Sequence, residues 1–294
     1  MLVNESSSAA YYATDVHGSV WGLSAQLSRD EIAGLARGLA EEALSLAVPG
    51  RRPVVSIDVF DTLLLRNSKF ELRRFWEIAH LQANHWPTAT PAAASLAETL
   101  YIARIDGARL AYAVAPRLGR SSEPTLDDIY AAYRRLPGLA DSDYQFLRGW
   151  ELSYEEQNLR ANPVIVAVVE MVREAGAQVV CISDVYLKAV DISRLISTCG
   201  IGHRFDVVYS SADTGLTKAS GLAFRNVAAR LSIAADEFVH LGDNAVVDGS
   251  GAVSIGARSI IVPVSRIETQ RRDDDEDAFR VFLEEERPFL PVVW

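Results

Sequence analysis

Residues 54–66 read VVSIDVFDTLLLR, and this stretch decides the fold. An apolar run ends at Asp58, a second carboxylate follows at Asp61, and a further apolar run begins after Thr62. In open α/β sheets, chemistry is placed at the carboxyl ends of the strands. The stretch therefore predicts a buried strand at 53–58 that carries an acid to the reactive edge of a sheet.

Strands and helices are expected to alternate after Asn162-Pro163. The predicted strands lie at 179–183, 206–210, 237–241 and 258–262, and the predicted helices between them at 164–175, 188–198 and 219–230. Such alternation implies βαβ units and a parallel sheet that is covered on both faces. The predicted class is α/β, with a Rossmann-like, doubly wound core.

The segment 67–162, called the insertion below, is helical in its sequence pattern and contains no β-rich run. Ser28 and Glu31 have the spacing of a capping box, which predicts a helix at 29–47, and Ser68 and Glu71 repeat that spacing. The predicted organisation is a lead-in and helix at 1–52, an α/β core at 53–66 and 163–270, the all-helical insertion at 67–162, and a tail at 271–294.

Composition narrows the classes of partner. The chain has 294 residues and a net charge of −10, which argues against a nucleic-acid surface, because phosphate backbones attract clustered Lys and Arg. No apolar run approaches the roughly 18 residues that span a bilayer, so no membrane segment is expected. Two cysteines make no disulfide framework, and Cys181 lies in an apolar run. A reducing cytoplasm fits this usage.

Four predicted strand ends carry polar side chains. The groups are Asp58; Ser183 with Asp184; Thr217 with Lys218; and Asp243 with Asn244, followed five residues after Asp243 by Asp248. A carboxylate can attack an electrophile, while a hydroxyl and an ammonium group can hold anionic oxygens. Further carboxylates can hold Mg²⁺, a hard cation that prefers oxygen ligands.

In this order, each at the end of an apolar strand, these groups resemble the haloacid dehalogenase (HAD) superfamily of aspartate-nucleophile hydrolases. The resemblance covers 53–66 and 163–263, with the insertion where that family places its type-one cap. The strings FDTLLLR, ISDVYL, KASGLAF and HLGDN resemble a subgroup of predicted hydrolases often found beside, or fused to, glycosyltransferases. The resemblance implies five parallel strands in the order 3-2-1-4-5 and a cap that closes over their tips.

The resemblance also implies a role for each residue. Asp58 would form an aspartyl-phosphate, and Mg²⁺ would be held by Asp58, Asp243 and the backbone carbonyl of Phe60. Lys218 would screen the charge of Asp58 and the phosphate. The substrate-binding residues would be Thr62, Ser183, Asp184 and Lys218. Asp248 would lie in the outer coordination shell of the metal or reach it through a water, and Asn244 would orient that shell. The substrate would be a small phosphorylated metabolite such as a sugar phosphate.

One position departs from the family pattern. Phosphatases of this superfamily usually have, two residues after the nucleophile, an Asp that transfers protons, and here that place holds Phe60. In one reading the protein is a Mg²⁺-dependent phosphatase in which Asp61, or a residue of the insertion, supplies the proton. In a second it is a metal-free dehalogenase, since haloacid dehalogenases place an aromatic residue there and halide leaves unaided.

The fourth strand end favours the first reading, because Asp243 and Asp248 beside the nucleophile would repel it unless a cation were present. A third reading is a protein that uses the pocket for another group transfer in a biosynthetic pathway, or a binding module without turnover. The identity of the substrate and the oligomeric state stay open.

Overall fold

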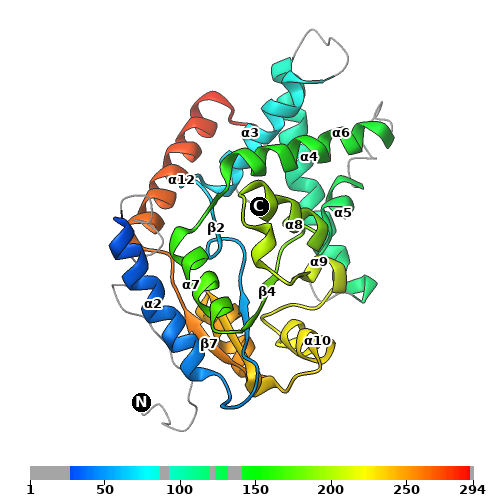
Figure 1. Cartoon of the computed structure of the whole chain (residues 1–294). Coiled ribbons are helices and arrows are strands. Elements are labelled where there is room, and N and C mark those ends of the chain that lie inside the picture. Colours follow the sequence, from blue (N-terminus) through cyan, green and yellow to red (C-terminus); the bar gives the residue numbers. More distant parts are fainter. Residues whose placement is uncertain (1–26, 87–92, 120–122, 132–140, 292–294) are drawn as a thin grey trace, which may run out of the picture.

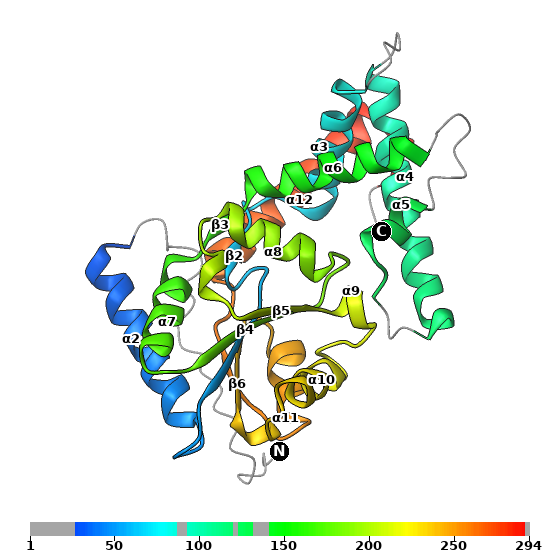
Figure 2. The same cartoon turned by 45° about the vertical axis from the view of Figure 1, so that its right-hand side comes forward.

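The computed structural model describes residues 27–86, 93–119, 123–131 and 141–291. The predicted lead-in over 1–26 and the last residues of the tail, 292–294, lie outside this part. In Figures 1 and 2 the described chain forms a sheet flanked by helices, with the insertion gathered at one end of the molecule.

The central sheet confirms the predicted order. Its five strands are all parallel in the order β5-β4-β1-β6-β7, which is 3-2-1-4-5 along the chain. The strands are β1 (Val54–Ile57), β4 (Gln178–Ser183), β5 (Val207–Ser210), β6 (Phe238–Gly242) and β7 (Arg258–Ile261). Ile57 of the central strand pairs with Cys181 on one side and Leu241 on the other. The carboxyl ends of β1, β4 and β6 therefore lie side by side.

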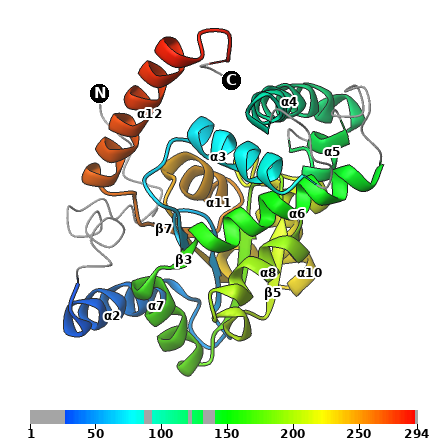
Figure 3. The same cartoon turned by 90° about the horizontal axis from the view of Figure 1, so that it is seen from above.

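The two faces of the sheet bury two separate apolar clusters, as strand alternation requires. In β4, Val179 and Cys181 pack into the larger cluster, whereas Val180 and Ile182 pack into the smaller one. The larger cluster includes side chains of α2 (Arg29–Leu46), α7 (Pro163–Glu174) and α8 (Ala189–Thr198), and the smaller includes those of α10 (Leu222–Leu231) and α11 (Gly251–Val253). Figure 3 shows α2 beside α7. The sheet is thus covered on both faces, as expected.

The insertion is joined to the core by a short antiparallel pair, β2 (Leu64–Leu65) with β3 (Arg160–Ala161). Between them, the described residues form only helices, which confirms the inserted helical unit: α3 (Glu71–Asn84), α4 (Ala93–Val114), η1 (Ala115–Leu118), α5 (Leu126–Ala131) and α6 (Asp141–Asn158).

Of the two predicted capping boxes, the first is confirmed. Ser28 accepts a hydrogen bond from the amide of Glu31, whose side chain accepts from the amide of Ser28. The second is wrong, because α3 has Phe70 as its N-cap and the hydroxyl of Ser68 donates to Glu268 of the distant helix α12 (Arg266–Glu286).

A buried ion pair within the insertion lies against a residue of the core. Arg104 of α4 donates two hydrogen bonds, of 3.0 and 2.9 Å, to Glu151 of α6, and both residues are at most 2% exposed. The guanidinium lies 5.0 Å from the ring centre of Tyr186, which follows β4. The backbone carbonyl of Tyr186 accepts from the amide of Leu126 at the start of α5. The contacts of Tyr186 therefore hold α4 and the start of α5 against the carboxyl end of the sheet.

Helix α12 leads back from the sheet to the insertion (Figure 2). Asp275 accepts from the amide of Phe70 at 2.8 Å and pairs with Arg73 at 2.8 Å. The predicted boundary between 270 and 271 falls inside this helix. Within the described residues, no helix combines the length and apolarity needed to cross a bilayer. The remaining short elements are η3 (Gly202–Arg204), α9 (Ser211–Thr214), η4 (Ala235–Glu237) and η5 (Ala245–Ser250).

Candidate active site

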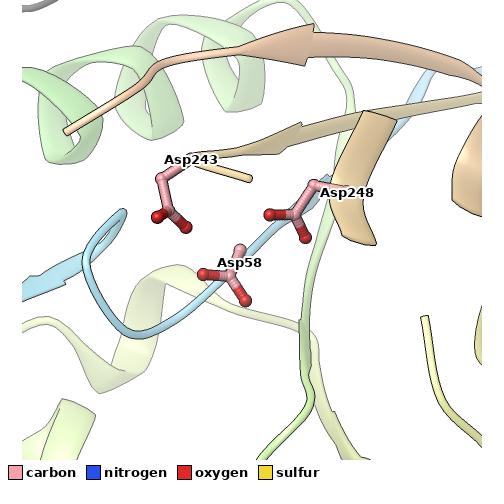
Figure 4. A group of neighbouring side chains, drawn as sticks. All are labelled: Asp58, Asp243 and Asp248. Carbon is pink, nitrogen blue, oxygen red and sulfur yellow. The ribbon is translucent and has the colours of Figure 1, made fainter. Parts of the chain in front are cut away.

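Three carboxylates converge at the carboxyl end of the sheet (Figure 4). Asp58 follows β1, Asp243 follows β6, and Asp248 lies in η5; one oxygen from each lies within 4.8 Å of the other two. The hydroxyl of Thr62 donates to Asp58 at 3.3 Å and is 3.5 Å from Asp243. The structure thus brings together acids that lie up to 190 residues apart in the sequence.

The ammonium group of Lys218 bridges two of these acids. Its Nζ donates to Asp58 and, at 2.6 Å, to Asp248, and the side chain is 3% exposed. The backbone amide of Lys218 donates to Asp184 at 2.7 Å, which fixes the loop against the end of β4. Burial lowers the pKa of Lys218, but the neighbouring carboxylates outweigh burial and raise it above its ordinary value. The residue is therefore a fixed positive charge at the nucleophile.

One lysine does not neutralise this cluster. Burial raises the pKa of Asp58 to about 7 despite the opposing charge of Lys218. Burial and the neighbouring carboxylates raise the pKa of Asp243 to about 8. Among the described residues, Lys218 is the only cationic side chain that lines the surrounding cavity. The donor set, several carboxylates with excess negative charge, fits a hard divalent cation such as Mg²⁺.

A cavity of about 370 Å³ opens onto the cluster and is called the active-site cavity below. It is lined by Asp58, Phe60, Glu123, Ser183, Asp184, Thr217, Lys218, Ala219, Asp243, Asn244, Val247 and Asp248. All but two of the residues singled out in the sequence line it. The two exceptions are Thr62 and Asp61. The hydroxyl of Thr62 still contacts Asp58, whereas Asp61 lines a different cavity.

The five-residue step from Asp243 to Asp248 is accommodated by η5, a turn of π-helix, a rare form that often occurs at functional sites. The side chain of Asn244 caps this turn by accepting from the amides of Val246 and Val247. The backbone amide of Asn244 donates to Asp248 at 3.0 Å. Asn244 thus shapes the turn that returns Asp248 to the lysine.

Gly242 makes this return possible, and Gly242→Ala should disrupt it. A Cβ at this position would lie 2.2 Å from Cγ of Asp248, whose carboxylate is held by Lys218 and His240. We expect a loss of about 1–3 kcal/mol in the free energy of unfolding. Urea denaturation measures it. Gly38→Ala is the control, because a Cβ in this part of α2 meets nothing within 4 Å; equal stability of the two variants would contradict the prediction.

A buried chain of hydrogen bonds through His240 and Ser56 holds the carboxylate of Asp248 in place. His240 Nε2 lies 2.9 Å from Asp248, and His240 Nδ1 lies 2.7 Å from the hydroxyl of Ser56 on the adjacent strand. Burial lowers the pKa of His240, so the ring is neutral. Its Nε2–H then donates to the carboxylate and Ser56 donates to Nδ1. Ser56 and His240 are fully buried, so this Ser-His-Asp series positions Asp248 and cannot act as a nucleophilic triad.

Asp61 is directed away from the active-site cavity. Its carboxylate accepts two hydrogen bonds from Arg272 of α12, at 2.8 and 3.0 Å, and it lines a separate cavity of about 250 Å³. Burial alone would raise the pKa of Asp61, but Arg272 holds it below its ordinary value. Such a carboxylate is a poor proton donor. The geometry therefore counts against the expected proton-transfer role of Asp61.

The backbone at Asp61 has φ of +63°, in the left-handed region that favours glycine. Phe60 lines the active-site cavity, and the guanidinium of Arg66 lies 4.2 Å from its ring centre. Arg66 lines the second cavity, so each member of this stacked pair lines a different cavity.

Sequence reasoning missed Glu123, which lies in the insertion and lines the active-site cavity. It precedes a proline in a loop, with no recognisable motif around it. Burial and the charge of Asp184 raise the pKa of Glu123 to about 7, and a hydrogen bond from Tyr112 opposes them. No local signal distinguishes it from a surface acid, because only the packing of the insertion brings it to the strand ends.

The fold and site define an α/β protein with an acidic centre at the strand tips and a helical insertion after the first strand. A family model for haloacid dehalogenase-like hydrolases matches residues 53–256. The chain belongs to this family.

Solved structures are similar to this chain at low sequence identity. A 2-haloacid dehalogenase from Pseudomonas syringae pv. tomato DC3000 is 15% identical, with a TM-score of 0.50, over 72% of this chain and 86% of that chain. A predicted phosphoglycolate phosphatase from Haemophilus somnus 129pt is 11% identical, with a TM-score of 0.42, over 73% and 86%. A putative β-phosphoglucomutase from Thermotoga maritima is 13% identical, with a TM-score of 0.46, over 71% and 83%. No curated protein matched the chain.

Proposed function

We propose that this HAD-family hydrolase is a Mg²⁺-dependent phosphatase that cleaves a small phosphomonoester through an aspartyl-phosphate on Asp58. The excess of buried carboxylate carries the proposal: Asp58, Asp243 and Asp248 converge, and the ammonium of Lys218 pairs with Asp58 and Asp248. A metal-free centre would have to hold this charge uncompensated or take up protons. A divalent cation would relieve it and, when bound, would neutralise charge on the phosphoryl oxygens.

The proposed roles follow the contacts. Asp58 attacks phosphorus while Lys218, fixed between Asp58 and Asp248, offsets its charge and that of the phosphoryl group. The proposed metal ligands are Asp58, Asp243 and the Phe60 carbonyl, with Asp248 and Asn244 supporting them, and the proposed phosphoryl-binding residues are Thr62, Ser183, Asp184 and Lys218. The insertion acts as a cap that excludes water and selects the substrate, for which we propose a sugar phosphate or a related biosynthetic intermediate.

A metal-free dehalogenase is the second candidate. The observation that favours it is Phe60, an aromatic side chain on the cavity wall where a phosphatase usually has an acid. In that reaction Asp58 would displace halide from carbon, and no proton would be needed by the leaving group.

A substrate screen separates the candidates. We expect phosphate release from members of a panel of sugar phosphates and aryl phosphates with Mg²⁺, and none with EDTA. Halide release from 2-chloropropionate in EDTA would instead support the dehalogenase. The absence of both products would favour a protein that only binds its ligand.

Metal binding can also be measured without turnover. Mg²⁺ at 100 times its dissociation constant should stabilise the fold by about 2.7 kcal/mol. Asp243→Asn should lose most of this gain, because it removes a proposed ligand. The control is Asp236→Asn, an exposed acid of η4 outside the cavity. Thermal denaturation with and without Mg²⁺ measures the stabilisation. If Mg²⁺ stabilised the wild type and both variants equally, a metal site at Asp243 would be contradicted.

A further inference from the structure

The positions two and three residues after the nucleophile supply no group for proton transfer. Phe60 has no titratable atom, and Asp61 is held by Arg272 at the second cavity. Hydrolysis of a phosphomonoester needs a proton for the leaving oxygen and a base for the attacking water. If the proposed phosphatase function holds, that group must come from another part of the cavity wall.

We propose that Glu123 is the general acid and base of the reaction at Asp58. Among the described residues, it is the only member of the insertion that lines the active-site cavity. Its carboxyl group therefore shares one cavity of about 370 Å³ with Asp58 and Lys218. Every other lining residue comes from the core.

The surrounding contacts hold Glu123 in place. The hydroxyl of Tyr112 in α4 donates to its Oε2 at 3.4 Å. Two residues later, Thr125 and Asp128 form reciprocal hydrogen bonds that cap α5. The next amide, that of Leu126, donates to the core loop at 2.7 Å. The loop that carries Glu123 is thus fixed on the side of α5.

The environment suits a carboxyl group that exchanges protons near neutral pH. Burial and the nearby charge of Asp184 raise the pKa of Glu123 to about 7. The ideal acid or base has a pKa close to the working pH. Apart from Asp58 and Asp243, the other acid of the wall with a raised pKa is Asp184. Its carboxylate accepts a 2.7 Å hydrogen bond from the backbone amide of Lys218, whereas the hydrogen bond from Tyr112 to Glu123 is longer, at 3.4 Å. Glu123 is therefore the stronger candidate, and Asp184 is tested beside it.

The two half-reactions balance with Glu123 as the only proton carrier. First, an oxygen of Asp58 forms a bond to phosphorus, the bond from phosphorus to the alcohol oxygen breaks, and protonated Glu123 gives its proton to that oxygen. Next, Glu123 takes a proton from water, the water oxygen bonds to phosphorus, and the bond to Asp58 breaks. Asp58 returns as a carboxylate, inorganic phosphate is released, and Glu123 is protonated again.

Glu123→Gln tests the assignment through two aryl phosphates with Mg²⁺. Turnover of phenyl phosphate should fall about 10²–10⁴-fold, because its leaving oxygen needs a proton. The better leaving group of 4-nitrophenyl phosphate should still depart. That substrate should give a burst of one equivalent of 4-nitrophenol and a slow steady state, with labelled phosphate trapped on the acid-quenched protein.

Matched variants exclude a structural cause. Glu123→Asp keeps a carboxyl group and should recover part of the phenyl phosphate turnover. If Glu123→Gln and Glu123→Asp lost this turnover equally, the effect would be due to packing and the proposal would be overturned. Asp106→Asn, an exposed acid of α4 paired with Arg109, should behave as wild type. A burst and stall in Asp184→Asn but not in Glu123→Gln would also overturn it.

The result for the wild type separates the two levels of inference. Wild-type protein that forms no trapped phosphate with either substrate would overturn the proposed function, and the role of Glu123 with it. Wild-type turnover with an unchanged steady state in Glu123→Gln would overturn the role of Glu123 alone.

Discussion

Asp58→Asn should reduce phosphate release by about 10⁴-fold or more, because the amide cannot attack phosphorus. The carboxylate lies at the tip of the central strand, between the ammonium of Lys218 and the hydroxyl of Thr62. The two contacts reach different oxygens of Asp58, so they orient a carboxylate that is proposed to supply both the nucleophile and a metal ligand. Phosphate release under saturating substrate and Mg²⁺, together with trapping of labelled phosphate on the protein, measures the loss.

The same variant should keep its stability, which distinguishes a catalytic loss from unfolding. The pKa of Asp58 in the fold is raised to about 7, so the stabilising contribution of its protonated form is lost as pH rises through about 7. Asn carries no charge at any pH. In EDTA at pH 8, we therefore expect Asp58→Asn to unfold at the same temperature as wild type or higher. Near-normal phosphate release by Asp58→Asn would contradict the proposed aspartyl-phosphate mechanism.

Lys218→Met should destabilise the fold by about 3–5 kcal/mol near neutral pH, because it leaves buried carboxylates without their cation. Lys218 is the shared partner of Asp58 and Asp248, and without it Asp248 keeps the hydrogen bonds to the ring of His240 and to the amide of Asn244. Activity should also be lost, since nothing then offsets the charge of the nucleophile. Urea denaturation in EDTA gives the free energy of unfolding.

The destabilisation of Lys218→Met should depend on pH. Without the ammonium, burial and mutual repulsion raise the pKa of both carboxyl groups. Their protonated forms then stabilise the fold at low pH, and this contribution disappears as pH rises through the raised pKa values. The difference from wild type should therefore be smaller at pH 5 than at pH 8.

Lys188→Met is the matched control for this variant. Lys188 pairs with Asp127 at 2.6 Å, but its side chain is 37% exposed, and such surface pairs contribute at most about 1 kcal/mol. Its loss should be small and nearly independent of pH. Equal losses in the two lysine variants would show that the buried charge at Lys218 has no special role.

The sheet could be predicted from the sequence because its causes are local. Strands that are buried on both faces have short apolar runs in the sequence, and the helices between them have periodic apolar patterns. Residues such as Ile57 and Cys181 can therefore be assigned to strands from their neighbours alone. The family resemblance then supplied the order of the strands. Most of the site followed, since Asp58, Ser183 and Asp243 end parallel strands, and parallel strands end at one edge.

Side-chain partners far apart in the sequence could not be predicted. Asp61 follows the nucleophile closely in sequence, yet a left-handed backbone at that residue accompanies a pairing with Arg272, 211 positions away. Ser68 has the spacing of a helix cap but donates to Glu268 instead. In both cases the partner lies on α12, which packs against the segment before and at the start of the insertion, and no pattern around the residue encodes that contact.

The sequence by itself determined the class of fold, the strand that carries Asp58 and the polar groups at the strand tips, because these depend on runs of neighbouring residues. Only the tertiary structure decided which acids share a cavity. It turned Asp61 toward Arg272 and placed Glu123 of the insertion on the wall of the cavity that Asp58 also lines. The physical reason is that proton transfer depends on proximity and burial, and both are set by packing between segments distant in the chain.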